Sequence, residues 1–154
     1  MRRADRMVTD PQWLCRVLDA APYIVLGLSG EDGPYAVPLN FAHADGCIYF
    51  HSARQGRKLD CLRRDPRVSV TAVATARLVG QGGRACDMGM AYESVCASGT
   101  AEILTDGKER GEALRAIILR YGGDPATVSE AEARGVALVR VRLTCVSGKR
   151  ANMS

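Results

Sequence analysis

The sequence predicts a mainly β fold (α+β), a small barrel of six antiparallel strands with a few short helices. Six segments of the 154-residue chain are rich in apolar and β-branched residues and are bounded by turn residues. The connections between the first three segments are too short for the crossovers that parallel strands need. The last segment, 136–146, alternates apolar and polar residues, which is typical of a half-exposed strand. At this length we expect a single domain, residues 1–154.

The first half of the chain predicts one helix followed by three strands. Asp10 is a suitable N-cap, Pro11 fits the first helical position, and the helix should end near Pro22. Turns at 30–33 and 44–46 separate the strands, and we expect an antiparallel meander. The three strands are expected at 23–29, 35–41 and 47–52.

The second half predicts two long strands, a helix and a final strand. A short helix at 57–64 should stop at Asp65-Pro66, and Gly99 marks a bulge or bend in one of the strands. Asp106 can cap a helix that runs through Tyr121, and 127–130 resembles the capping box of one more short helix. The strands are expected at 67–79, 91–104 and 136–146, with a glycine-rich break at 80–83.

Composition excludes several classes of function. The net charge is +4, and the basic residues gather at 2–6, 54–67 and 140–150 with almost no aromatic residues among them. Proteins that bind single-stranded nucleic acid need both features, so a small anionic ligand fits better than a nucleic acid. The longest apolar run, 23–28, is too short to span a bilayer, and no apolar segment follows the basic N-terminus. We expect a soluble cytoplasmic protein.

Six cysteines occur, without a C-x-x-C motif and without close spacing to His43 or His51. Metal sites need clustered ligands, so the sequence predicts no metal site. We expect mostly buried free thiols, and we assign Cys86 to this class by default.

The segment 49–60 is the most informative in the chain. A strand runs into a turn of small residues, and a helix then begins with Arg57 and Lys58. With Ser52 and Gly56, these cations form a candidate phosphate cradle, because helix N-terminal N–H groups and positive charge both attract anions. The alternative is an ordinary solvated helix face.

Three further polar residues have two interpretations each. Strand alternation places His51 on the same face as Tyr49. His51 is then either a hydrogen-bonded residue of the core or rim, or an active-site group. His43, near a turn, is most simply a surface residue. Asn40 either bonds the edge of a heterocycle or sits beside a turn. Pro38, inside the same strand as Asn40, indicates an edge, a bulge or a neighbouring ligand.

The sequence contains no Ser-His-Asp order, paired carboxylates or complete P-loop, so the chemistry would come from a cofactor. The motifs, taken together, resemble the FMN-binding split-barrel family related to pyridoxamine 5'-phosphate oxidase, and most closely its 5-nitroimidazole-resistance (Nim) branch. The matching segments are 1–10, 33–41, 48–53, 56–60, 65–68, 92–95 and 148–149.

This resemblance implies a six-stranded Greek-key split barrel that forms a homodimer, with FMN bound in two clefts at the interface. It implies that one strand lines the flavin ring, with Val37, Pro38, Leu39 and Asn40. A second strand end and the helix start would hold the phosphate, with His51, Ser52, Ala53, Gly56, Arg57 and Lys58, and His51 would stand near flavin and substrate. Ser94 and Val95 would lie at the dimer-related cleft.

The leading functional hypothesis is therefore an FMN-dependent oxidoreductase that reduces a small electron-poor substrate of the 5-nitroimidazole type. The alternative is a non-catalytic flavin-binding or redox-sensing dimer. A third possibility is that the barrel binds another ligand, such as haem or a deazaflavin.

Overall fold

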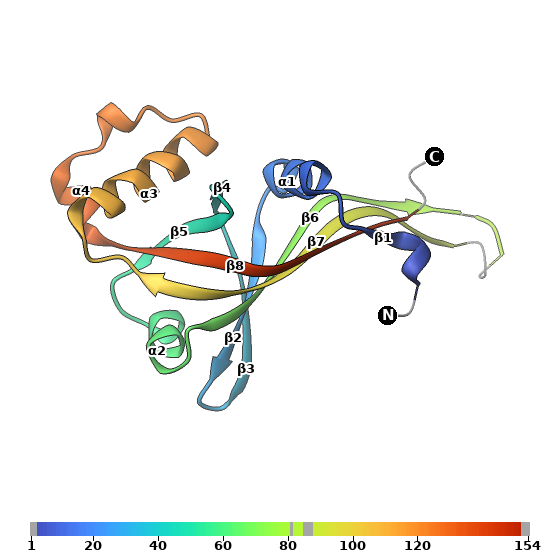
Figure 1. The fold of residues 1–154 in the computed structure, drawn as a ribbon, viewed down its shortest axis with the longest axis horizontal. Coiled ribbons are helices and arrows are strands. Elements are labelled where there is room, and N and C mark those ends of the chain that lie inside the picture. Colours follow the sequence, from blue (N-terminus) through green and yellow to red (C-terminus); the bar gives the residue numbers. More distant parts are fainter. Residues whose placement is uncertain (1–2, 81, 85–87, 152–154) are drawn as a thin grey trace.

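The computed structural model describes residues 3–80, 82–84 and 88–151, which form one long curved sheet with helices along it (Figure 1). The strands are β1 (Met7–Val8), β2 (Ile24–Gly30), β3 (Gly33–Leu39), β4 (Ala42–Ala44), β5 (Cys47–Ala53), β6 (Arg67–Val79), β7 (Gly89–Ile103) and β8 (Val136–Ala151). The helices are α1 (Pro11–Ala20), α2 (Arg57–Arg64), α3 (Gly107–Arg120) and α4 (Glu130–Gly135), with 3-10 turns η1 (Ala4–Arg6) and η2 (Pro125–Thr127).

The sheet is antiparallel throughout, in the order β3-β2-β6-β7-β8-β5-β4, with β1 added to β8. Leu26 and Leu39, from one end of this order, share a core cluster with Phe50, from the other end. The sheet therefore curls until its two ends enclose one core, although no ladder joins β3 to β4 or β5 among the described residues. This arrangement fits the predicted split barrel. The six expected strands are present, and the short strands β1 and β4 add to them.

The predicted meander is wrong. β2 and β3 form the expected hairpin, but β5 pairs with β4 and β8 at the opposite end of the sheet. Tight turns fix only which neighbours in sequence can pair, whereas the curl of the sheet decides the partners of β5.

Helix α1 forms as predicted and packs on the sheet. The Asp10 carboxylate accepts hydrogen bonds from the backbone N–H groups of Gln12 and Trp13. Trp13 lies so close to Gly148 of β8 that a side chain at this glycine would collide with its ring. Glycine at position 148 therefore allows the helix to approach the strand closely.

One prediction for the second half holds and two need correction. The Gly99 irregularity is confirmed as a register shift after Ser98, where a Cβ on Gly99 would lie 2.6 Å from a backbone oxygen. The capping box instead joins Ser129 and Glu132, because the 3-10 turn η2 takes up the preceding residues. The last strand runs to Ala151 rather than to 146, because β7 pairs with it to that point.

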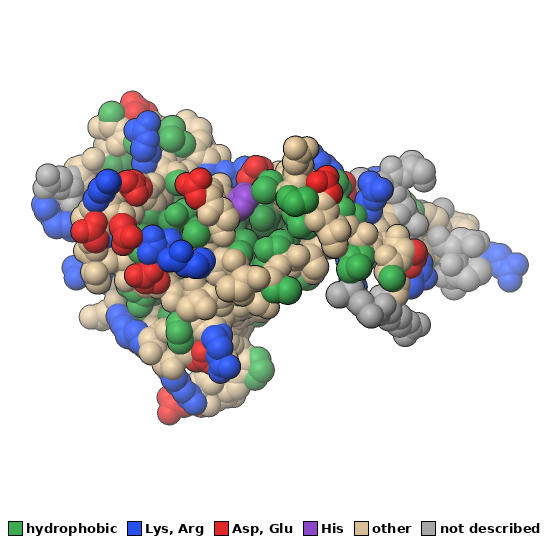
Figure 2. All heavy atoms as spheres, viewed as in Figure 1, with side chains coloured by type: hydrophobic (Ala, Val, Ile, Leu, Met, Phe, Trp, Pro, Cys, Tyr) green, Lys and Arg blue, Asp and Glu red, His purple; other side chains and the backbone are tan. Residues whose placement is uncertain are grey.

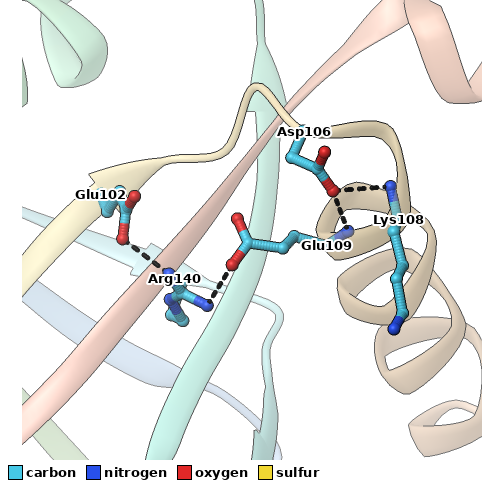
Figure 3. Close-up of polar contacts among 5 residues, drawn as sticks. All are labelled: Glu102, Asp106, Lys108, Glu109 and Arg140. Atoms are coloured by element: carbon cyan, nitrogen blue, oxygen red, sulfur yellow. Dashed lines mark hydrogen bonds and ion pairs between the residues drawn. The ribbon is translucent and has the colours of Figure 1, made fainter.

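A second, smaller core lies under α3, where Leu104, Ile117 and Leu138 are buried. The guanidinium of Arg140 on β8 links β7 and α3, because it donates hydrogen bonds to Glu102 of β7 at 2.7 Å and to Glu109 of α3 at 3.1 Å (Figure 3). The two carboxylates raise the pKa of Arg140 above its usual range. Arg140 therefore stays charged and bridges three elements.

The cysteine prediction is only partly correct. Among the five cysteines in the described part of the chain, Cys47 and Cys61 are buried, whereas the other three are exposed, namely Cys15, Cys96 and Cys145. Cys96 and Cys145 lie on the outer faces of β7 and β8, as strand alternation requires. Cys86 lies outside the described residues. Across the described ranges, no helix is both long and apolar enough to cross a membrane.

Candidate functional site

The start of helix α2 presents unsatisfied backbone donors. Gly56 is its N-cap with φ of 120°, a conformation that residues with a side chain rarely adopt, and no side chain caps the helix. An uncapped helix start leaves N–H groups without intrahelical partners, and the helix dipole adds positive potential there. An anion would satisfy both.

Lys58 brings a positive charge to this helix start. Its ammonium lies 5.5 Å from the centre of the Phe50 ring and is partly buried, which lowers the pKa of Lys58. Among the described residues, no carboxylate forms an ion pair with it. Burying a cation without a partner is unfavourable, so this position fits an anionic ligand better than it fits an isolated protein surface.

Ser52 completes this arrangement. It shares the inner face of β5 with Phe50, is 8% exposed, and its hydroxyl has no hydrogen-bond partner in the described part of the chain. An ammonium, a hydroxyl and free backbone N–H groups are the donors that a phosphate group accepts from. The residues present therefore fit the predicted phosphate group.

Arg57 points elsewhere. Its guanidinium lies 4.5 Å from the centre of the Tyr35 ring on β3, in a cation–π contact. It also borders a hollow lined by Glu31, Asp32 and Asp60. Successive helical residues are rotated by about 100°, which separates the two adjacent cations. Lys58 lies over the Phe50 ring of β5, on the strand face that also carries Ser52, whereas Arg57 is directed to the β2–β3 hairpin.

His51 and Ser52 face opposite sides of β5. His51 is exposed on the side of Tyr49, as predicted, and lies opposite Leu138 of β8. β4 pairs only with 47–49, so the rest of β5 has an unpaired edge on that side. A ligand that touches both His51 and Ser52 must therefore lie across this open edge. Ala53, the last residue of β5, is exposed on the same side as His51.

The segment predicted to line a flavin ring borders the same opening. β3 is an edge strand that pairs only with β2, which agrees with the proline at 38. Val37 and Leu39 point inward, whereas Pro38 and Asn40 are exposed. If the β4–β5 register continued, Asn40 would stand opposite His51, but pairing ends at Ala42. The two predicted segments thus flank the split between the sheet ends.

Ser94 and Val95 do not join this site within one chain. They lie midway along β7, opposite Lys149 and Gly148 of β8, where β8 also pairs with β1. Figure 1 shows β1 on the extended side of the molecule and α2 on the other. Val95 is fully buried in the core, whereas Ser94 is partly exposed.

The expectation of a surface position for His43 is wrong. Its side chain is 10% exposed, and Nδ1 lies 3.1 Å from an oxygen of Asp19. Nearby, the Tyr121 hydroxyl accepts a hydrogen bond from the Phe41 backbone at 3.0 Å. Sequence reasoning missed these partners and also Tyr35, because contacts between distant segments leave no local signal.

The comparisons with known proteins decide the family. The sequence matches the family described as pyridoxamine 5'-phosphate oxidase over residues 10–150. The chain belongs to this family. A comparison with curated proteins found no match.

Several solved structures share the fold. A Bacteroides thetaiotaomicron protein named for 5-nitroimidazole antibiotic resistance is 29% identical, with a TM-score of 0.82 over 93% of this chain and 85% of its own. An FAD-binding protein from Mesorhizobium loti is 26% identical, with a TM-score of 0.69 over 96% of this chain and 98% of its own. The flavocytochrome Anf3 from Azotobacter vinelandii, at 22% identity, shows the fold alone, with a TM-score of 0.84 over 99% of this chain and 72% of its own. Together with family membership, these relatives support a flavin-linked role.

Proposed function

We propose that this protein is an FMN-dependent oxidoreductase that reduces a small electron-poor acceptor of the 5-nitroimidazole type. The observation that carries the proposal is the partly buried ammonium of Lys58, which has no carboxylate partner among the described residues and lies beside an uncapped helix start. Family membership and the resistance-related relative support the choice of a flavin and of a nitro substrate.

The residues divide the work of binding. Lys58, the Ser52 hydroxyl and the α2 N–H groups bind the phosphate, and Val37–Asn40 line the ring. Bound FMN supplies hydride transfer between a two-electron donor and the acceptor, chemistry that no side chain offers. The protein orients the ring across the split and limits the access of water to it.

We assign His51 the proton step. It is exposed at the split, and a ring nitrogen of His51 donates a proton to the reduced acceptor, because histidine is the side chain that most often serves as a general acid. A His51→Gln variant should keep its flavin and lose turnover at least about tenfold. Loss of the flavin would instead assign His51 to binding, and unchanged turnover would remove it from the reaction.

We further propose a homodimer in which Ser94 and Val95 serve the cleft of the partner chain. Leu78 and Met88, at the end of the β6–β7 hairpin, are 59% and 55% exposed, and an isolated chain gains nothing from exposing them. Figure 2 also shows apolar side chains gathered at the waist of the molecule, between the α3–α4 end and α1. Sedimentation analysis should give a dimer that Leu78→Glu weakens, and a monomeric wild-type protein would contradict this arrangement.

The decisive experiment for the flavin is an absorbance spectrum followed by a redox cycle. Protein supplied with FMN should be yellow, should bleach anaerobically with reduced nicotinamide, and should recolour when a nitroimidazole is added. A protein that stays colourless with added FMN would refute the proposal, and a haem or deazaflavin spectrum would redirect it.

The second candidate is a non-catalytic flavin-binding or redox-sensing dimer. It is favoured by one observation, namely that His51 faces away from Lys58 and Ser52. In this case the flavin bleaches, but a nitroimidazole causes no recolouring beyond that due to oxygen.

A further inference from the structure

A cavity with an unusual concentration of arginine is lined by residues of α2, of α3 and of the start of β8. Its volume is 410 Å³, within the range of small-molecule sites. Its floor is apolar and includes Leu59 and Leu104, which are almost fully buried. No Asp or Glu lines it among the described residues, whereas four arginines do, namely Arg54, Arg63, Arg110 and Arg134.

Arg110 contributes a charge that is not neutralised. It donates to the backbone oxygens of Leu104 at 3.2 Å, Ala133 at 2.8 Å and Val136 at 3.0 Å. These bonds use three of the five N–H donors of a guanidinium. No carboxylate of the described residues pairs with Arg110 or with Arg54, so both keep their full charge beside the cavity.

The acidic residues of this region are engaged elsewhere. Asp106 caps α3 by accepting from the N–H groups of Lys108 and Glu109, and the Glu109 carboxylate turns toward Arg140 (Figure 3). Glu132 accepts hydrogen bonds from Ser129, which lowers its pKa. Of Arg54, Arg63 and Arg110, Arg63 alone has an acidic partner in the described part of the chain, Asp60, and that pair is exposed and therefore weak.

The hollow beside Arg57 provides a contrast on the same helix. It contains Arg57 and Arg64, but also Glu31, Asp32 and Asp60, so its carboxylates outnumber its cations. If the charge of the cavity lined by Arg110 came only from the many arginines of α2, the hollow beside Arg57 would be equally positive. The cavity lined by Arg110 stands out because no Asp or Glu of the described residues lines it.

We propose that this second cavity binds a small organic phosphate, with Arg54 and Arg63 on the phosphate and the organic part over the apolar floor. Guanidinium groups recognise phosphate through paired N–H donors, and the field of Arg110 adds to the attraction. The cavity contains none of the residues assigned to FMN, and its occupancy does not depend on FMN binding. Its occupant has two possible sources: the adenylate part of a dinucleotide flavin, or a separate phosphorylated molecule.

AMP is a suitable probe, with uncharged adenosine as its control. Calorimetric titration of the purified protein should detect one AMP per chain and no comparable binding of adenosine. The double variant Arg54→Gln, Arg63→Gln should weaken AMP by about tenfold or more, because two charge-assisted contacts are lost. The matched control is Arg115→Gln, an exposed arginine of α3 outside the cavity, which should leave AMP binding unchanged. Equal binding of AMP and adenosine, or an equal loss in both variants, would overturn the proposal.

Competition with flavins distinguishes the sources. If FAD displaces AMP and FMN does not, the cavity holds the adenylate part of the cofactor. If neither displaces it, the occupant is a separate phosphorylated molecule. If FMN displaces AMP, the probe is bound at Lys58, and the cavity is not the site. Because AMP binding needs no flavin, a colourless protein would refute the proposed function without deciding this one.

Discussion

Two cations beside strand β5 have opposite surroundings. Arg140 lies opposite Tyr49 and is held by Glu102 and Glu109 on its two sides (Figure 3). Lys58 lies over Phe50 on the other face and has no acidic partner among the described residues. The first charge is balanced by the fold itself, while the second remains available to a ligand. The pKa values agree, because ion pairs raise that of Arg140 and burial lowers that of Lys58.

This contrast separates a structural cation from a binding cation by its partners rather than by its burial. Removing Arg140 should therefore change stability and leave flavin binding intact. Removing Lys58 should do the reverse.

The largest effect is expected for Lys58→Met, which keeps the length of the side chain and removes its charge. FMN should dissociate about 10- to 100-fold more readily, because a charge-assisted phosphate contact is lost. Fluorescence quenching of FMN measures this, with Lys108→Met as the control, since Lys108 is exposed on α3. An unchanged Kd for FMN in Lys58→Met would contradict the assignment of Lys58 as a binding cation.

Arg140→Met should lower the free energy of unfolding by about 1–2 kcal/mol, between the values for exposed and buried ion pairs, because two carboxylates lose their partner. Thermal or urea unfolding measures it. Arg142→Met, which removes an exposed arginine of the same strand, should have little effect. A loss of flavin affinity in folded Arg140→Met protein would argue against a purely structural role.

A pH titration gives the next effect. Phosphate binding favours the charged form of Lys58, so FMN affinity should be full below the lysine's pKa and should fall as pH rises through it. Because burial lowers that pKa, the fall should begin below the value of an exposed lysine, about 10.4. Lys58→Arg should remove the dependence, since arginine does not titrate there. An identical fall in both proteins would assign it to another group.

The smallest effect is expected for Arg57→Gln. Its guanidinium stacks on Tyr35 rather than beside Ser52, so FMN affinity should change by about threefold or less, as for a screened surface charge. The same titration measures it. A loss as large as that of Lys58→Met would mean that Arg57 turns toward the phosphate when the ligand binds.

Much of the fold follows from local sequence. β6 and α2 have the predicted bounds, Asp10 and Asp106 cap their helices, and the Gly99 irregularity lies where expected. Strand alternation also predicted that His51 shares a face with Tyr49. These features depend on residues a few positions apart, whose spacing can be read directly from the sequence. The site assignments drawn from the family resemblance remain predictions, to be tested by the variants above.

Partners distant in sequence were decided only by the tertiary structure. β5 pairs with β8 instead of β3. The imidazole of His43 is hydrogen-bonded to Asp19, and the guanidinium of Arg57 stacks on Tyr35 instead of lying beside Lys58. The sequence by itself determined most of the elements, the caps of α1 and α3, and the membership in a flavin-linked family. The curl of the sheet decided which charges are balanced and which are left for a ligand, because charge balance depends on groups that only the folded chain brings together.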